Sequence, residues 1–416
     1  MGTSSTVDVV VVGAGAAGLA ATREARDLGL TVLALEASDR IGGRAFTDPR
    51  PFGLPWDRGC HWLHSADVNP FTPLADGYGF RYRREPPARR VHLGPRWATP
   101  EEAQAQEAFV DRGFEAALAA GRAGRDVAVA SVVERDHPWI GVFEAVVHAE
   151  WGVGLEEAST GDAAAYRDTR RNWPVEDGYG ALVARHAAGV EVTRSTGVER
   201  IEWGGRGVRV ATPKGTLEAG ATIVTVSTGV LAAGAIRFEP ALPDWKLEAV
   251  AALPLGAANK VAFKIDGRRL GVEEHTSLLA PLADGTLVGF QLRPFGWDLV
   301  NGYLAGPPCR ELEREGEAGM TAAMLEALTG VFGGEIASHV EATACTTWGR
   351  DPLVRGAYAA ARPGLSRCRA DLARPLGERL FFAGEATSPE WFSTCHGAHL
   401  SGIATARAVA AALGRT

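Results

Sequence analysis

The pattern of apolar and polar positions at the start of the chain predicts one compact unit. Residues 7–12 form a nearly continuous valine run bounded by glycine, which is typical of a strand buried on both faces of a parallel sheet. An alanine-rich stretch predicts a helix over residues 19–28, with Gly29 as its cap. A second apolar run predicts a strand over residues 31–35. These elements make a complete β-α-β unit.

Further along, the pattern is first helical and then rich in strands. Between residue 76 and about residue 185, composition and spacing predict helices over 101–125 and 139–150. Short apolar runs punctuated by glycine and proline then predict strands over residues 189–193, 198–203, 208–212, 223–226, 259–265 and 287–292. A helix is expected over 320–331, a last buried strand over 380–384 and a final helix over 396–413. Two domains with interleaved segments fit this order better than two consecutive domains.

Composition and charge exclude several classes of protein. The 416 residues carry 43 Lys plus Arg against 50 Asp plus Glu, a net charge of −7, which argues against a nucleic-acid binder. An apolar fraction of 46% and a charged fraction of 22% are those of a globular protein. No segment has the roughly 18 apolar residues of a membrane span, and no charged-then-apolar leader is visible, so we expect a soluble, cytoplasmic protein. Only four lysines occur: Lys214, Lys246, Lys260 and Lys264.

The cysteines predict neither a disulfide framework nor a metal site. They are five in number, widely spaced and without a Cys-x-x-Cys pair: Cys60, Cys309, Cys345, Cys368 and Cys395. We therefore expect no bound metal, and most of these thiols should be small buried apolar groups.

A glycine-rich turn between the first strand and the first helix predicts a dinucleotide site. Gly13 permits the tight turn, Gly15 lets backbone N–H groups approach a pyrophosphate, and Gly18 allows the helix to pack closely on the strand. Glu36 follows the second strand, where a carboxylate can accept both ribose hydroxyls and disfavours a 2′-phosphate.

Two further segments indicate which dinucleotide is bound. Gly42, Gly43 and Arg44 form a second glycine turn whose guanidinium can clamp the same diphosphate. At the other end of the chain, Gly384 and Glu385 follow a buried strand and precede the last helix. A site that draws on both ends of the chain suits a permanently held FAD better than an exchanging nicotinamide.

With these motifs in view, the sequence resembles the flavin-containing amine oxidases. The resemblance rests on GAGAAGLAATREARDLGLTVLALEASDRIGGRAFT, DGYGALVARHA and LFFAGEATSPEWFSTCHGAHLSG. Within that family, DRGCHWLHSADVNPF and EWFSTCHGAHLSG are similar to the polyamine oxidases of the spermine and acetylpolyamine type. Residues 81–97 match nothing in the family pattern.

The resemblance implies an α/β fold with two interleaved domains. An FAD-binding Rossmann-like domain would comprise residues 1–75, 186–240 and 355–416. An α+β substrate-binding domain would comprise residues 76–185 and 241–354.

The resemblance also implies roles for single residues. Glu36 would bind the adenosine ribose, Val198 would contact adenine through its backbone, and Arg44 and Glu385 would stand near the diphosphate and ribityl chain. The stretch from Gly59 to Trp62 would pass along the isoalloxazine, with the helix after Thr394 and Cys395 aimed at its pyrimidine end. Trp348 and Tyr358 would wall the substrate cavity.

Two positions depart from the monoamine oxidase pattern. Ala357 stands where those enzymes carry the cysteine that bonds to FAD, so the flavin should be held noncovalently. Thr394 stands at the place of the second cage tyrosine, so Tyr358 would form that wall without a partner ring.

The predicted catalytic residues are Lys260 and His64, together with Tyr358 and Trp348 of the cavity wall. Lys260 and Lys264 share one face of an alternating strand, which by itself would indicate a solvated edge. The resemblance instead implies that Lys260 holds a water beside the hydride-accepting flavin nitrogen and favours electron transfer to dioxygen. His64 would be a cavity histidine that binds the amine or assists its deprotonation, although a lone histidine is more often structural.

The predicted function is therefore an FAD-dependent oxidase that converts a polyamine, or a related secondary or primary amine, to an imine. The imine would be hydrolysed to an aldehyde and an amine, and dioxygen would be reduced to hydrogen peroxide. Distal ammonium groups would need carboxylates, and the candidates are Glu150, Glu157 and Asp162. One alternative is an L-amino-acid or aromatic monoamine oxidase, for which Arg293 or Arg355 could hold a carboxylate. Another is a noncatalytic FAD-binding scaffold, which the presence of Lys260 disfavours. The sequence gives no indication of the oligomeric state.

Overall fold

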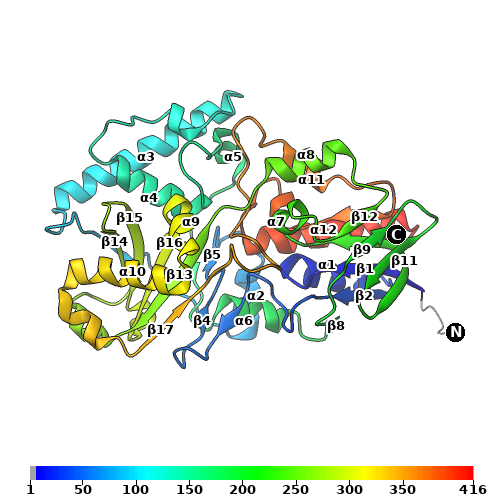
Figure 1. The fold of residues 1–416 in the computed structure, drawn as a ribbon, viewed down its shortest axis with the longest axis horizontal. Coiled ribbons are helices and arrows are strands. Elements are labelled where there is room, and N and C mark those ends of the chain that lie inside the picture. The colour runs from blue at the N-terminus through cyan, green and yellow to red at the C-terminus, as the bar shows by residue number, and fades with distance from the viewer. Residues whose placement is uncertain (1–5, 416) are drawn as a thin grey trace.

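The computed structural model describes residues 6–415, which fold around two large sheets (Figure 1). The first sheet has eight strands in the order β12-β9-β10-β11-β1-β2-β8, with β18 beside the end of β11. Its strands are β1 (Thr6–Val12), β2 (Val32–Leu35), β8 (Val192–Thr193), β9 (Arg200–Glu202), β10 (Val208–Thr212), β11 (Gly215–Val224), β12 (Arg237–Glu239) and β18 (Leu380–Phe382). Strands β8, β2, β1, β11 and β18 run parallel, with β1 at the centre.

Helices cover both faces of this sheet, as the buried valine run of β1 requires. On one face, α1 (Ala16–Asp27) and α12 (Cys395–Ala412) lie side by side and share a core with Val9 and Val11 (Figure 1). On the other face, Val10 and Val12 pack with side chains of β9, β10 and β18. The helices there are α7 (Thr228–Ala232), α8 (Asp244–Ala252) and α11 (Cys368–Ala373).

The second sheet has six strands in the order β17-β13-β16-β15-β14-β6 and is antiparallel except for the pair β14 and β6. Its strands are β6 (Ala88–Val91), β13 (Ala258–Lys264), β14 (Thr276–Pro281), β15 (Leu287–Leu292), β16 (Leu299–Ala305) and β17 (Ala342–Cys345). One face packs on α9 (Gly306–Arg314) and α10 (Gly316–Phe332) through a core that includes Val261, Phe263 and Phe290. Since side chains alternate along a strand, Lys260 lies on the opposite face.

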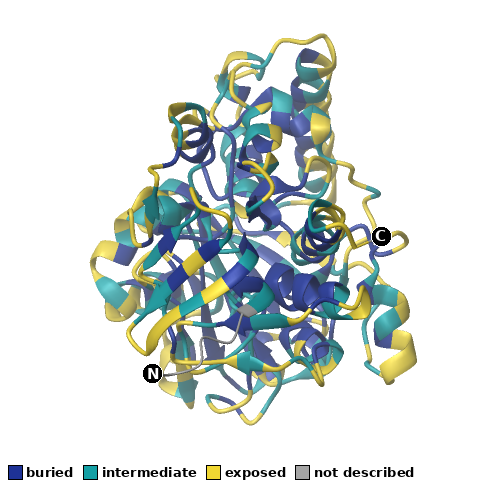
Figure 2. Ribbon diagram, turned by 90° about the vertical axis from the view of Figure 1, so that its right-hand side faces the viewer, coloured by how far each residue is buried: buried dark blue, intermediate teal, exposed yellow. Residues whose placement is uncertain are grey.

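The remaining elements form a helical layer and small ribbons. The helical layer contains α3 (Pro100–Arg122), α4 (Ile140–Trp151) and α5 (Thr160–Ala165), which share a core of their own. Between the two sheets lie α2 (Phe71–Tyr78), α6 (Tyr179–His186), and the paired two-residue strands β3 (Thr47–Asp48) with β4 (Trp56–Asp57) and β5 (Trp62–Leu63) with β7 (Trp173–Pro174). Figure 2 shows that the strands are mostly buried and that exposed residues gather on outer helices and loops.

Most predicted elements are present, and the differences have local causes. Strands β10 and β15 span the predicted residues, whereas α1 begins at Ala16, inside the glycine motif, because Gly15 is its N-cap. The strand predicted over 223–226 is the end of ten-residue β11, which pairs with β10 across the turn at Lys214. Within residues 6–415, no helix is long and apolar enough to cross a membrane. The division into two domains stays a prediction.

Candidate functional site

The turn from β1 into α1 has the geometry that a bound pyrophosphate needs. Gly13 has φ of 102°, a conformation that side chains disfavour, and a Cβ on Gly18 would lie 1.9 Å from the carbonyl oxygen of Gly13. A Cβ on Gly15 would instead meet no atom within 4 Å, so the backbone of the turn borders open space. No side chain caps the N-terminus of α1. Its first N–H groups are therefore free to bind an anion.

Glu36 lies beside this turn, at the end of β2. Its carboxylate accepts hydrogen bonds from the backbone N–H of Ala14 at 2.7 Å and from that of Ser38 at 2.9 Å. The backbone N–H of Thr196 donates to the Glu36 carbonyl at 2.8 Å, which brings the segment of Val198 next to Glu36. The structure thus brings together the two residues predicted to bind the adenosine.

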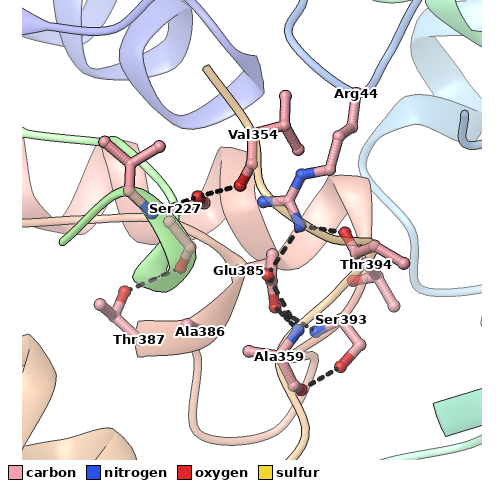
Figure 3. Close-up of polar contacts among 12 residues, drawn as sticks. Arg44, Ser227, Val354, Ala359, Glu385, Ala386, Thr387, Ser393 and Thr394 are labelled. Atoms are coloured by element: carbon pink, nitrogen blue, oxygen red, sulfur yellow. Dashed lines mark hydrogen bonds and ion pairs between the residues drawn. The ribbon is translucent and has the colours of Figure 1, made fainter. Parts of the chain in front are cut away.

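The second glycine turn packs against the first. The N–H of Gly42 donates to the carbonyl of Ala14 at 2.8 Å, and a Cβ on Gly43 would lie 3.3 Å from the Cα of Gly15. This contact directs Arg44 toward Glu385, with which it forms an ion pair of 3.0 Å, and Arg44 also donates to the carbonyl of Ala357 (Figure 3). Arg44 therefore joins the N-terminal turns to the C-terminal segment.

Glu385 is the buried centre of these contacts. Its carboxylate also accepts from the backbone N–H of Ala359 at 3.2 Å and of Ser393 at 3.0 Å (Figure 3). The next residue, Thr394, is the N-cap of α12, and its hydroxyl accepts from the N–H of Gly397 at 3.0 Å. The Thr394 side chain therefore serves the helix end, as a threonine in place of a cage tyrosine permits.

The residues at the end of the parallel strands fit FAD. A small cavity between the ends of β11 and β18 is lined by Arg44, Thr228, Gly384 and Glu385, among others. The hydroxyl of Thr228 is buried and has no hydrogen-bond partner, so it is available to a ligand. Together with the open space at Gly15, these groups form a cradle at the carboxyl edge of a parallel sheet, where dinucleotides bind.

Lys260 and Trp348 hold the backbone that leads into the predicted flavin-lining stretch. The Lys260 ammonium donates to the carbonyl of Asp57 at 2.7 Å, and the Trp348 indole donates to the carbonyl of Arg58 at 3.2 Å. Gly59 follows, and a Cβ there would lie 1.8 Å from the carbonyl oxygen of Arg44. Lys260 is 6% exposed, and burial lowers its pKa to about 8. The other lysine of the strand, Lys264, is at the surface and pairs with a glutamate.

The stretch from Gly59 to Trp62 continues to the start of α12. Cys60 neighbours Cys395, the first residue of that helix, and this contact together with burial raises the pKa of the Cys60 thiol. The N-terminus of α12 therefore meets the stretch that was predicted to line the isoalloxazine. The structure brings Lys260, Trp348, Gly59, Trp62, Thr394 and Cys395 into one region; their roles toward the flavin remain predictions.

His64 and Tyr358 lie near two carboxyl groups and a tyrosine that we call the Glu150 cluster, consisting of Glu150, Asp168 and Tyr166. His64 exchanges a hydrogen bond with Asn172 at 2.9 Å, and the Tyr358 hydroxyl donates to the carbonyl of Ala149 at 2.5 Å. Glu150 has an exposed surface, yet desolvation and the charge of Asp168 raise its pKa to about 7. The raised pKa follows from desolvation of the carboxyl group by the surrounding protein, with a smaller part from the charge of Asp168.

The other two candidate carboxylates are engaged elsewhere. Asp162 forms a buried ion pair with Arg369 at 2.5 Å and accepts from the N–H of Ala361 at 2.8 Å. Glu157 forms a bidentate pair with Arg310 at 2.8 and 2.9 Å, and both side chains are partly exposed. Glu150 is therefore the one of the three that the structure leaves available for an ammonium group.

The sequence analysis did not identify three polar residues of this region: Asp57, Asn259 and Tyr303. The buried Asp57 carboxylate accepts from the N–H groups of Tyr179 and Gly180 and so caps α6. Asn259 accepts from the N–H of Trp348 at 2.9 Å and fixes that loop. Tyr303 lies opposite Lys260 on β16, with its ring 5.5 Å from the ammonium. Only Asn259 had a local signal, since it precedes Lys260 in the same strand.

The fold and the site define a flavoprotein of the amine-oxidising class. A family model described as flavin containing amine oxidoreductase matches residues 16–119 and 118–410, and the chain belongs to this family. Its cofactor is accordingly FAD, which confirms the prediction from the motifs.

The relatives agree with that assignment. Polyamine oxidase 4 of Oryza sativa subsp. japonica is 31% identical over 97% of this chain and 88% of its own length. Lysine-specific histone demethylase 1 homolog 2 of Arabidopsis thaliana is 29% identical, but this chain spans only 57% of that protein. A solved putrescine oxidase double mutant, redesigned for cofactor binding, superposes with a TM-score of 0.79 at 20% identity, covering 98% of this chain and 99% of that one. This likeness confirms the predicted fold class.

Proposed function

We propose that the protein oxidises a polyamine, or a related secondary or primary amine, and passes the electrons to dioxygen. FAD, when bound, accepts a hydride from the carbon next to the amine nitrogen. The resulting imine is hydrolysed to an aldehyde and an amine, and two electrons and two protons reduce dioxygen to hydrogen peroxide. The residues of the chain would bind the amine, keep the reacting nitrogen neutral and promote the reaction with dioxygen.

The observation that carries this proposal is the Glu150 cluster beside His64 and Tyr358. An amine with a second, cationic nitrogen needs an anion at a distance from the reacting carbon. Glu150 can supply one, since it belongs to none of the described ion pairs, although the charge of Arg170 acts on it as well as that of Asp168. Asp168 adds negative charge to the same region and also acts on His64. Negative charge near one end of the site favours a cationic substrate over an anionic one.

Two side chains would serve the two halves of the reaction: His64 would deprotonate the amine, and Lys260 would promote the reduction of dioxygen. Burial lowers the pKa of His64, so the imidazole is neutral at pH 7 and can accept a proton from the substrate. Lys260, protonated at pH 7, would stabilise the negative charge that develops as dioxygen is reduced.

The rival substrates have less support. An amino-acid substrate needs a free arginine, but Arg293 donates to the carbonyl of Val272 on the α10 side of the six-stranded sheet, and Arg355 is exposed. The scaffold alternative does not account for a buried lysine whose pKa desolvation lowers to about 8.

Anaerobic mixing of the purified holoprotein with spermine, spermidine and their N-acetylated forms tests the proposal. At least one of these should bleach the flavin absorption, and air should restore it with formation of hydrogen peroxide. An L-amino acid or an aromatic monoamine that bleaches the flavin while all four polyamines fail would overturn the polyamine assignment. Absence of bleaching with every amine would overturn the oxidase assignment itself.

A further inference from the structure

A chain of four polar side chains crosses the face of the six-stranded sheet that carries Lys260. The Trp56 indole N–H donates to Asn301 Oδ1 at 3.1 Å, Asn301 Nδ2 donates to the Tyr303 hydroxyl at 3.1 Å, and that hydroxyl donates to Gln291 Oε1 at 2.9 Å. Register places Tyr303 opposite Lys260, and Gln291 opposite Asn301, on adjacent strands. Asn301, Tyr303 and Gln291 therefore share one face of the sheet with Lys260, and Trp56 of β4 packs onto that face.

The donor-to-acceptor direction of these hydrogen bonds is fixed by the first side chain, Trp56. An indole N–H can only donate, so the atom of Asn301 that faces Trp56 must be the oxygen, and its amino group must face Tyr303. The Tyr303 hydroxyl accepts from Asn301 and is approached by the indole N–H of Trp62, a second donor, so its own proton is left for Gln291. The atom of Gln291 that faces it is therefore the carbonyl oxygen. The usual ambiguity of amide side chains is removed at both positions.

The last group of this hydrogen-bonded series, the amide N–H of Gln291, is a donor without an acceptor. Gln291 is 6% exposed, and its Nε2 atom is buried with no hydrogen-bond partner among the described residues. A buried donor that stays unpaired costs free energy, and its donor strength is raised by the bonds that polarise it from behind. Such a group is built to meet an acceptor that the chain itself does not supply.

This donor lies on the sheet face that carries Lys260, opposite to the apolar core. The ring of Tyr303, which orients Gln291, lies 5.5 Å from the Lys260 ammonium, and the indole of Trp62 approaches the Tyr303 hydroxyl. Trp62 belongs to the stretch predicted to line the flavin. The opposite face of the same sheet is the apolar core against α10.

We propose that Gln291 donates a hydrogen bond to an oxygen of the substrate, so that the preferred amine carries a carbonyl or hydroxyl oxygen as well as the nitrogen that is oxidised. An ammonium group has no lone pair and cannot accept this bond. Gln291 would therefore disfavour a second cation beside its amide, whereas Glu150 favours one beside its carboxylate. The proposal rests on the proposed function for its substrate. The same chemistry could come from a ring carbonyl of the flavin, and the test separates the two sources.

Two amines that cannot be oxidised provide the test. Both carry two methyl groups in place of the hydrogens on the carbon next to nitrogen; one ends in an amide carbonyl and the other in an alkyl group of equal length. Titration calorimetry with the holoenzyme should show that the carbonyl ligand binds about tenfold to a hundredfold tighter. Gln291→Met, close in shape but without donors, should remove this preference, and Gln291→Leu serves if the first variant loses FAD.

The chain offers a matched control. Gln106 is another buried glutamine whose amide has no partner, but it lies on α3. Gln106→Met should leave the ratio of the two dissociation constants unchanged. Tyr303→Phe, which frees the Gln291 amide to turn over, should reduce the ratio without abolishing it.

Other outcomes would contradict the proposal. Equal binding of the two ligands by the unchanged enzyme, or an equal loss for both in the Gln291 variants, would overturn it. A shifted flavin spectrum in ligand-free Gln291→Met with an unchanged ligand ratio would assign the acceptor to the flavin and overturn the substrate assignment. Because these measurements need no turnover, failure of the matching oxidisable amines to bleach the flavin would count against the proposed function alone.

Discussion

At the scale of single residues, Lys260 has the most sharply defined surroundings. It keeps one acceptor, the Asp57 carbonyl, and faces the ring of Tyr303. We expect Lys260→Met to slow reoxidation of the reduced flavin by dioxygen about a hundredfold, with a smaller effect on flavin reduction by the amine. Stopped-flow absorbance of the two half-reactions measures both rates.

Lys264 supplies the control for this experiment, since it lies on the same strand but at the surface. Lys264→Met should leave both rates unchanged. Because burial lowers the pKa of Lys260 to about 8, the ammonium is lost as the pH rises through that value. The reoxidation rate of the unchanged enzyme should therefore fall above about pH 8, and the fall should be absent in Lys260→Met. A pH profile that is the same in both proteins would contradict the role of the lysine.

Glu150 leads to a second prediction at this scale. Replacing it by glutamine removes the charge that would hold a distal ammonium, so KM for a diamine should rise about tenfold while KM for a monoamine stays constant. Since the pKa of Glu150 is raised to about 7, its carboxylate forms as the pH rises through 7, and diamine binding should strengthen over that range.

Glu157→Gln is the comparison for Glu150, because its carboxylate pairs with Arg310 outside the cluster. It should change neither KM. Equal effects of the two substitutions would mean that Glu150 acts only through the general charge of the helical layer.

At the scale of elements, the contact of α1 with the glycine turn is the feature most sensitive to a single atom. Gly18→Ala would place a methyl group 1.9 Å from the carbonyl oxygen of Gly13, so the helix must move away from the turn. We expect this variant to lose FAD on gel filtration. Gly330→Ala, in α10, meets open space and should instead stabilise the protein by about 0.5–1 kcal/mol in thermal unfolding. Retention of FAD by Gly18→Ala would contradict the role of the turn.

The sequence could predict features whose partners lie nearby in the chain, but not those whose partners lie far away. The glycine turn and Glu36 are local signals, with their partners within one β-α-β unit, so both their place and their geometry could be predicted. Asp57 bonds to the start of α6, 122 residues away in sequence, and Trp56 bonds to Asn301, 245 residues away. Such partners depend on how the two sheets meet, which no local pattern specifies. For that reason the sequence did not indicate Tyr303 or Gln291, and it left Asp162 among three candidate carboxylates although Asp162 pairs with Arg369.

At the scale of the whole molecule, that ion pair connects the helical layer to the C-terminal segment. Asp162 lies on α5, and Arg369 also donates to the carbonyls of Ala359 and Ala386, the second of which follows Glu385. Asp162→Ala would leave a buried guanidinium without its counter-charge. We expect a loss of about 3–5 kcal/mol in the free energy of unfolding, measured by denaturant titration. The exposed pair provides the comparison, and Glu157→Ala should cost at most about 1 kcal/mol.

The mode of cofactor attachment is also a property of the assembled molecule. The Ala357 methyl group offers no atom for a thioether, and its carbonyl is engaged by Arg44. We therefore expect acid precipitation to release all the FAD into the supernatant, where its absorption can be measured. Yellow colour that remains in the washed pellet would show a covalent bond.

The distribution of the four lysines allows occupancy of the site to be followed by chemical labelling of lysine side chains. Lys246 is fully buried, with its ammonium bonded to the carbonyls of Asp371, Leu372 and Arg374, and Lys260 is 6% exposed, whereas Lys214 and Lys264 are at the surface. Besides the α-amino group, an amine-selective acylating reagent should modify these two side chains quickly. Acylation of Lys260 should be slower because it is 6% exposed, and we expect bound flavin and amine to slow it further. Intact-mass spectrometry, which measures the number of added acyl groups, would therefore report whether the site is occupied, with few other lysines to obscure the result.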